Sequence, residues 1–233
     1  DCLNTGCVPS KTLIRAARLA HEMRTADRYG LTPANPPVPF ERVMARVREA
    51  IRIIEPADSA ERYTGLGVDV RQGHATIVDP WTVAIDGEKR LTTRSIVIAA
   101  GGEPVVPDIP GLEESGYLTS DTLWDALGER ASVPERIVVI GGGPIGCELS
   151  QAFARLGSQV VQVEGGDRIM AREDAEVSAF VADALRADGV DLRLGSKAAR
   201  VDGKTLVLSD GSSVPFDELI VAVGRHARLG GYG

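Results

Sequence analysis

The sequence is poor in cysteine, histidine and aromatic residues. Three cysteines and three histidines occur among 233 residues, and aromatic side chains make up 4% of the chain. Three cysteines are too few for the disulfide framework of a small secreted protein. A close cysteine pair in a chain otherwise so poor in cysteine favours catalysis or metal binding, and we expect a cytoplasmic protein.

Long apolar runs and clusters of positive charge are missing as well. No run approaches the roughly 20 apolar residues of a membrane span, and nothing at the N-terminus reads as a signal peptide. The net charge is −7. Nucleic-acid binding normally needs a basic face, so we expect no nucleic-acid partner. Because the apolar runs are short, we also expect no membrane span in this chain.

Hydrophobic patterning predicts alternating helices and strands. Helices are expected over residues 8–28, 40–65, 144–156 and 174–188. Buried strands are expected over residues 95–100, 136–140, 159–164, 190–194 and 219–223, and short strands over 68–70, 73–78, 82–85, 90–92 and within 197–214. This alternation implies a parallel sheet with helices on its faces.

The two halves of the chain repeat one plan, a small β meander followed by a buried strand and a glycine. Residues 96–101 correspond in this way to residues 220–224. We predict an α/β fold with two Rossmann-like nucleotide-binding domains, the first incomplete. The expected boundaries are 1–106 for the first, partial nucleotide-binding domain, 107–225 for the second, and 226–233 for a return to the first. The chain begins at its reactive-looking cysteines, so we expect an internal fragment.

A dinucleotide-binding motif follows the strand at 136–140. Gly141, Gly143 and Gly146 occupy the glycine positions of G-x-G-x-x-G between a predicted strand and a predicted helix. They would permit a tight turn, a close approach to the pyrophosphate and close helix packing. Glu164 ends the next strand and would bind the ribose hydroxyls, which favours NAD; Arg168 leaves NADP open. The expected contacts are Gly141, Gly142, Gly143, Pro144, Ile145, Gly146 and Glu164. The alternative is a glycine turn that binds no nucleotide.

Cys2 and Cys7 flank a glycine-containing turn at the start of a predicted helix. A helix N-terminus stabilises a thiolate, and Gly6 gives two cysteines five residues apart the freedom to form a disulfide. A zinc site needs about four ligands, and His21 is the only histidine nearby. A chance pair of buried thiols would not explain the position, so redox chemistry is favoured.

The run from Cys2 to Lys11, CLNTGCVPSK, closely resembles the redox centre of the pyridine nucleotide-disulfide oxidoreductases, which include dihydrolipoamide dehydrogenase and mercuric reductase. The resemblance continues through residues 73–75 and 99–102, the nucleotide motif, and Gly224 with Arg225. It implies that Cys2 is the thiol that attacks the substrate and Cys7 the thiol beside the flavin.

The same resemblance implies the remaining roles. Lys11 would lie near the flavin N5 with Glu148 as its ion-pair partner, where a fixed charge helps hydride transfer. The bland alternative is two solvated surface charges. Ala75 matches a backbone contact to the flavin adenine, and the cofactor-binding residues expected beside Lys11 and Glu148 further include Ala100, Gly101 and Gly224.

The resemblance also implies cofactors and partners. FAD and NAD are expected, with NADP possible, and the intact protein would be a homodimer. The substrate would be a small disulfide or dithiol, or mercuric ion. The family's flavin glycine motif is absent from this sequence, so we expect the chain alone to be nearly colourless and inactive. The alternative function is a nucleotide-binding module without turnover.

Overall fold

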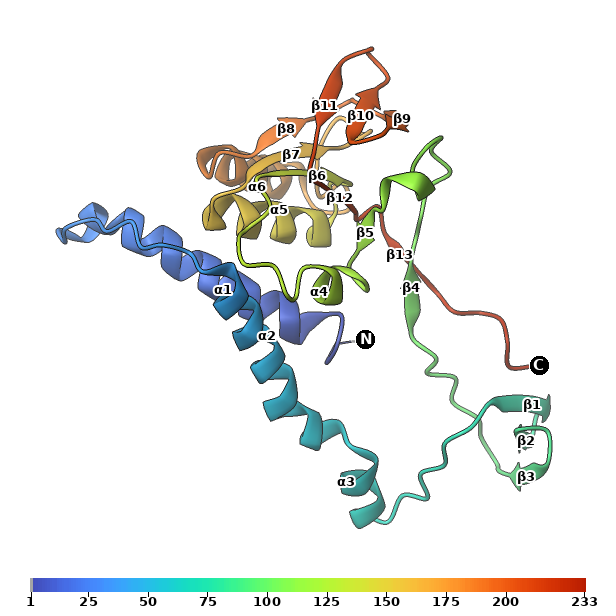
Figure 1. The fold of residues 1–233 in the computed structure, drawn as a ribbon. Coiled ribbons are helices and arrows are strands. Elements are labelled where there is room, and N and C mark those ends of the chain that lie inside the picture. The colour runs from blue at the N-terminus through green and yellow to red at the C-terminus, as the bar shows by residue number, and fades with distance from the viewer. Residues whose placement is uncertain (1) are drawn as a thin grey trace. The chain divides into compact units, whose positions relative to one another are not determined.

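The structure is a computed structural model and describes residues 2–233 (Figure 1). Asp1, with which the first expected domain begins, lies outside the described residues. The chain divides into two compact units. The first comprises the residues up to Arg52 together with Pro104–Arg225, and the second comprises Ile53–Glu103 and His226–Gly233. The first 52 residues group with residues 104–225, whereas the expected first domain covers residues 1–106. The expected domain boundaries stay a prediction.

A five-stranded parallel sheet forms the centre of the first unit. Its order is β5 (Leu118–Thr119), β12 (Glu218–Val221), β6 (Arg136–Ile140), β7 (Gln159–Val163) and β8 (Asp191–Arg193). Every neighbouring pair runs parallel. The α/β fold class is therefore confirmed, and the strands at 136–140 and 159–163 lie where the buried apolar runs predict them.

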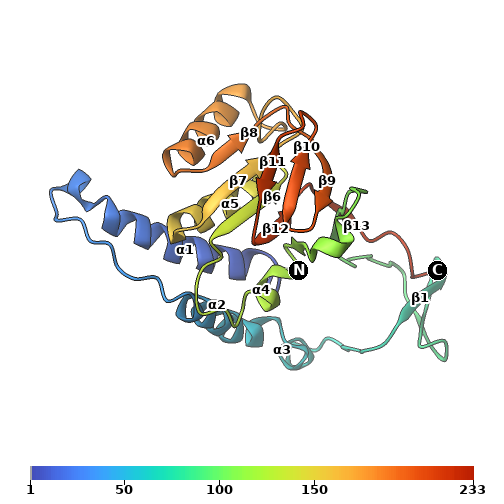
Figure 2. The ribbon, with the colours of Figure 1, turned by 45° about the horizontal axis from the view of Figure 1, so that its top comes forward.

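Alternating side chains of β6 separate two hydrophobic cores. Ile137 and Val139 pack on the side of α5 (Pro144–Leu156) and α6 (Ala175–Ala187). Val138 and Ile140 pack on the other side. An antiparallel sheet covers that second face, as Figure 2 allows the reader to follow; its strands are β9 (Ala198–Asp202), β10 (Thr205–Leu208) and β11 (Ser213–Pro215).

Helices cover one face of this sheet, and the predicted β meander covers the other. The meander over residues 198–215 supplies its own apolar face, with Leu206, Leu208 and Val214 buried against the parallel sheet. Since this small sheet already excludes water from the second face, no helix is needed there.

Two long helices of the N-terminal segment belong to the first unit. The helix α1 (Cys7–Arg24) packs on α5 through Leu13 and Ala17, and α2 (Phe40–Ile54) adds Phe40, whose ring lies 6.3 Å from that of Phe153. This packing brings the cysteine end of α1 to the beginning of α5.

The helix predicted over residues 40–65 is interrupted. It is replaced by α2, a 3-10 turn over Glu55–Asp58, and α3 (Ala60–Gly65). Pro56 lacks the N–H that a continuous helix requires, and the Ser59 hydroxyl accepts from the Arg62 N–H to begin the new helix. The helix predicted over residues 8–28 likewise ends at Arg24 and is followed by a 3-10 turn, Ala26–Tyr29.

The second unit contains a small antiparallel sheet of β1 (Ala75–Asp79), β2 (Thr82–Ile85) and β3 (Lys89–Thr92). The predicted hairpin turn is present, since Asp86 and Gly87 have φ values of 52° and 75°. The remaining short elements of the chain are a 3-10 turn at Glu113–Ser115, α4 (Leu123–Ala126), β4 (Gly102–Pro104) and β13 (Arg225–Ala227).

Two predicted strands of the second unit are not formed. Residues 68–70 and 95–100 have no strand assignment, and Val97 and Ile98 are 86% and 60% exposed. A strand exists through pairing with a neighbour, and no other strand among the described residues pairs with either segment. None of the helices within residues 2–233 combines the length and apolarity that crossing a bilayer requires.

Candidate active site

The predicted nucleotide residues lie at the carboxyl edge of the parallel sheet. Gly141 follows β6, Glu164 follows β7 and Gly224 comes shortly after β12. From β6 the chain proceeds through β7 to β8 on one side, whereas β12 lies on the other side. The order in which the chain adds strands to the sheet therefore reverses between β6 and β12. Open α/β sheets bind ligands at such a switch point.

The three motif glycines differ in their surroundings. Gly141 has a φ of +117°, and a Cβ there would lie 2.3 Å from the carbonyl oxygen of Ala222. A Cβ on Gly146 would lie 2.2 Å from the carbonyl oxygen of Gly141, so helix and turn are in close contact. At Gly143 a Cβ would meet nothing within 4 Å. The geometry matches a tight turn, an open approach and close helix packing.

Glu164, which follows β7, stabilises the glycine turn through hydrogen bonds. One carboxylate oxygen accepts from the Gly142 N–H at 2.6 Å and the other from the Gly166 N–H at 2.7 Å. A cavity of about 180 Å³ adjoins these groups; it is lined by residues 140–143, 163–165, 196, 198 and 223. The open face of Gly143 at the start of the 13-residue helix α5 fits a dinucleotide phosphate.

Cys2 and Cys7 form a disulfide in the structure, with Cα atoms 4.7 Å apart. That separation lies within the usual range for disulfides. Cys7 is the first residue of α1, the Val8 N–H donates to the Cys2 carbonyl at 3.0 Å, and both cysteines are exposed. The predicted pair is thus joined at a helix N-terminus and open to a reaction partner.

Lys11 and Glu148 form an ion pair across α1 and α5. The Lys11 Nζ lies 2.6 Å from each carboxylate oxygen of Glu148. The two side chains are 59% and 39% exposed, so the pair is accessible. The predicted partners therefore meet, and they meet beside the disulfide.

One cavity of about 350 Å³ joins the predicted groups. It is lined by Cys2, Thr5, Gly6, Cys7, Ser10, Lys11, Ser120, Trp124, Pro144, Ile145, Glu148, Leu149 and Arg225. The disulfide, the ion pair and the first turn of α5 therefore line the same cavity.

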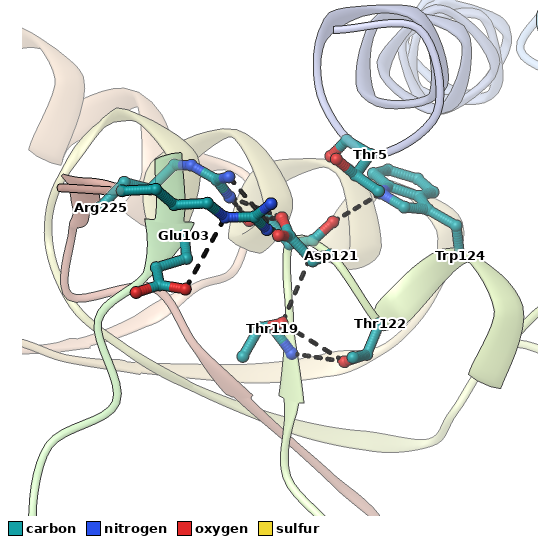
Figure 3. A network of polar contacts seen from close by, with 9 residues as sticks. Thr5, Glu103, Thr119, Asp121, Thr122, Trp124 and Arg225 are labelled. Atoms are coloured by element: carbon teal, nitrogen blue, oxygen red, sulfur yellow. Dashed lines mark hydrogen bonds and ion pairs between the residues drawn. The ribbon is translucent and has the colours of Figure 1, made fainter. Parts of the chain in front are cut away.

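Residues that sequence reasoning left without a role also line this cavity. Arg225 donates to Asp121 at 2.5 Å (Figure 3). It also donates to the Ser120 hydroxyl at 2.9 Å. The Trp124 indole N–H lies 3.2 Å from the Thr5 carbonyl and 2.8 Å from the Ser120 carbonyl. Arg225 had a sequence signal, since it follows Gly224 in the resemblance, whereas Trp124 had none.

The cavity is a candidate site for a redox cofactor. Its volume lies at the small end of the range for ligand pockets, roughly 300–1,000 Å³. A disulfide beside a lysine–carboxylate pair is a suitable environment for a redox-active ring. Ala75, Ala100 and Gly101 are exposed in the second unit, so their contact with the same cofactor is a proposal.

Two further titratable groups of the first unit have shifted pKa values. Burial raises the pKa of the Cys147 thiol, whose sulfur lies 3.5 Å from the Gly142 carbonyl. Desolvation, followed by the charge of Arg155, lowers the pKa of His21, against the opposing effect of Asp188 at 3.2 Å.

Within residues 2–233, no group of three or more His, Cys, Asp or Glu side chains could hold a metal ion.

Comparisons with known proteins agree with this geometry. A family model described as pyridine nucleotide-disulphide oxidoreductase matches residues 1–231. A mercuric reductase from Lysinibacillus sphaericus is 34% identical over 231 residues, which is 96% of this chain and 41% of that protein. A dihydrolipoyl dehydrogenase from Thermus scotoductus is 32% identical over 244 residues, which is 100% of this chain and 51% of that protein.

A solved structure is also similar. The Cu(II) complex of the HOCl-induced flavoprotein disulfide reductase RclA from Escherichia coli has a TM-score of 0.79 and 25% identity, covering 99% of this chain and 49% of that one. The chain thus spans about half the length, or less, of the relatives it matches.

Proposed function

Because the chain belongs to the pyridine nucleotide-disulphide oxidoreductase family, we propose that the full-length protein is an FAD-dependent enzyme. It passes electrons between NAD(P)H and a substrate by way of the Cys2–Cys7 disulfide. The supporting observation is the cavity that is lined at once by Cys2, Cys7, the Lys11–Glu148 pair and Pro144. FAD, when bound there, supplies the two-electron chemistry that links a nicotinamide to a pair of thiols.

The carboxyl edge of the sheet binds the dinucleotide in this proposal. The N–H groups at the start of α5 face the diphosphate, and the open side of Gly143 admits it. Glu164 accepts hydrogen bonds from the ribose hydroxyls and repels a 2′-phosphate, which favours NAD over NADP. The residues assigned to the dinucleotide are Gly141, Gly142, Gly143, Pro144, Ile145, Gly146 and Glu164.

The two cysteines have different tasks in the proposal. Cys7 lies at the first position of α1, where the helix N-terminus stabilises a thiolate. Cys2 attacks the substrate to give a mixed disulfide, and Cys7 then displaces the reduced substrate thiol and restores the Cys2–Cys7 bond, or the sequence runs in reverse. Both sulfurs belong to exposed residues, as exchange with a substrate requires.

Lys11 and Glu148 hold a fixed charge beside the disulfide. Each carboxylate oxygen of Glu148 lies 2.6 Å from the Lys11 Nζ, so the carboxylate holds the ammonium beside the cavity. We assign it to the flavin N5 edge, with Glu148 as a positioning residue. The other residues assigned to the flavin are Ala75, Ala100 and Gly101, whereas Gly224, which follows β12 at the carboxyl edge of the sheet, is assigned to cofactor binding there.

The substrate is a small disulfide or dithiol, or mercuric ion, since the same thiol pair reacts with each. Similar proteins carry the names mercuric reductase and dihydrolipoyl dehydrogenase. A cytoplasmic homodimer is part of the same proposal.

Steady-state oxidation of NADH tests the proposal. The full-length protein is loaded with FAD and offered lipoamide, oxidised glutathione or mercuric ion in separate assays. Turnover with one of these, lost in Cys7→Ser and kept in Cys147→Ser, is expected. Binding of NADH without turnover of any acceptor would instead support a nucleotide-binding module.

A further inference from the structure

Trp124 contacts the loop that carries both redox cysteines. Its indole N–H lies 3.2 Å from the carbonyl oxygen of Thr5, which lies between Cys2 and Cys7 in the chain. The side chain is 7% exposed and lines the same cavity as the disulfide. The indole N–H is therefore a buried donor that is shared between the cysteine loop and the turn after β5.

The same indole N–H also contacts the end of the parallel sheet. The same N–H lies 2.8 Å from the Ser120 carbonyl, directly after β5. The Ser120 hydroxyl accepts from Arg225, which also donates to Asp121 (Figure 3). Further hydrogen bonds between Thr119 and Thr122 close this turn. Trp124 thus links the cysteine loop to the turn after β5, which several hydrogen bonds stabilise.

We propose that Trp124 is a positioning residue that holds the cysteine loop in its disulfide-bonded conformation. The proposal rests on the proposed function, because it concerns the disulfide that the enzyme opens and closes. The bond from Trp124 to Thr5 is present in the oxidised loop. Opening the disulfide releases the two ends of the loop, so this bond is weakened on reduction and favours the oxidised form.

The consequence is a shift in a balanced exchange reaction. Two molecules of glutathione reduce the Cys2–Cys7 bond to two thiols and are themselves oxidised to glutathione disulfide. Trp124→Phe keeps the aromatic ring and removes the N–H. Loss of one hydrogen bond that is specific to the oxidised state should raise the equilibrium constant for reduction about fivefold.

The test is an anaerobic titration of the protein with glutathione buffers of stated ratio. Samples are quenched with acid, the thiols are alkylated, and the reduced fraction of the peptide with Cys2 and Cys7 is measured by mass spectrometry. The control is Trp81→Phe, because Trp81 is 60% exposed and belongs to the second unit. The replacement Trp124→3-benzothienylalanine keeps the bicyclic shape without the N–H, and serves if Trp124→Phe folds poorly.

A rise of about fivefold for both Trp124 variants, with Trp81→Phe unchanged, is the expected result. An unchanged equilibrium constant in the benzothienyl variant, or an equal shift in Trp81→Phe, overturns the proposal. A purely structural role would lower the melting temperature and leave this constant unchanged. The titration requires neither nicotinamide nor flavin, so failure of the proposed enzymatic function would not affect its outcome.

Discussion

The Lys11 ammonium lies 2.6 Å from both carboxylate oxygens of Glu148, although the two residues are 137 positions apart in the chain. The contact arises because α1 packs on α5 through apolar residues such as Leu13 and Ala17. The same packing brings Cys7, four residues before Lys11, to the wall of the cavity that Glu148 lines. A hydrophobic contact between helices thus sets the position of the charged groups in the site.

Lys11→Met is expected to separate a functional charge from a structural one. Exposed ion pairs contribute at most about 1 kcal/mol, so the free energy of unfolding should change little. NADH-dependent reduction of the disulfide should slow by about tenfold or more, because a fixed charge at the cofactor is lost. Stopped-flow absorbance and thermal unfolding provide the two measurements.

Arg46→Met is the matched control, because the Arg46–Glu49 pair on α2 has a similar exposure of 59% and 50%. Equal rates for the two variants would show that the Lys11–Glu148 pair is an ordinary surface contact.

Alanine at Gly141 should lower the stability of the fold, whereas alanine at Gly143 should weaken NADH binding. A Cβ at Gly141 would meet the Ala222 carbonyl at 2.3 Å, in a left-handed backbone conformation, and should destabilise the fold by about 3 kcal/mol or more. A Cβ at Gly143 meets nothing, so stability should change by less than about 0.5 kcal/mol. It would nevertheless occupy the approach to the diphosphate and weaken NADH binding about tenfold or more. Urea unfolding and fluorescence titration with NADH distinguish the two, and unchanged NADH binding in Gly143→Ala would place the dinucleotide elsewhere.

Glu164→Gln should reduce the preference for NADH over NADPH. The substitution removes the negative charge that faces a 2′-phosphate, and we expect the ratio of the two dissociation constants to change by about tenfold. One hydrogen bond to Gly142 or Gly166 weakens as well, so both nucleotides should bind somewhat less tightly. Isothermal titration measures both constants. Glu176→Gln, an exposed change in the first turn of α6, should leave the ratio unaltered. An unaltered ratio in Glu164→Gln would remove this residue from nucleotide selection.

His21 should make stability depend on pH in mildly acidic solution. Desolvation and the positive charges of Arg155, Arg28 and Arg24 lower its pKa in the fold below the ordinary value of about 6.5, and outweigh the opposing effect of Asp188. Between the lowered pKa and about 6.5, the unfolded chain therefore binds more protons than the folded one. Stability from this group is complete above about pH 6.5 and decreases as the pH falls through that window.

Melting temperatures between pH 5 and pH 8 measure this effect. His21→Gln should remove that component of the pH dependence. An unchanged profile in His21→Gln would show that the residue stays protonated or plays no part.

Much of the first unit could be predicted from local pattern. The apolar run at 136–140, the glycines at 141, 143 and 146, and the helix to Leu156 follow one another in the structure as expected. Buried parallel strands and glycine turns leave strong local signals because each residue is constrained by its own backbone and burial. The break at Pro56 was also readable in principle, since proline ends a helix wherever it interrupts one.

The rest depends on tertiary contacts that local pattern does not contain. The apolar run at 95–100 has strand composition, yet it has no pairing neighbour among the described residues. Lys11 and Glu148 could be paired only through the resemblance to a family. Trp124 had no assigned role, because its contact with Thr5 arises from the packing of α4 beside the cysteine loop.

The central claim is that a nicotinamide nucleotide reduces the Cys2–Cys7 bond, and counting thiols tests it most directly. The FAD-loaded full-length protein is mixed anaerobically with NADH and alkylated, and each cysteine is examined by mass spectrometry. We predict labels on Cys2 and Cys7 but not on Cys147, which is buried and has a raised pKa. Oxidation of NADH with the Cys2–Cys7 disulfide left intact would contradict the account.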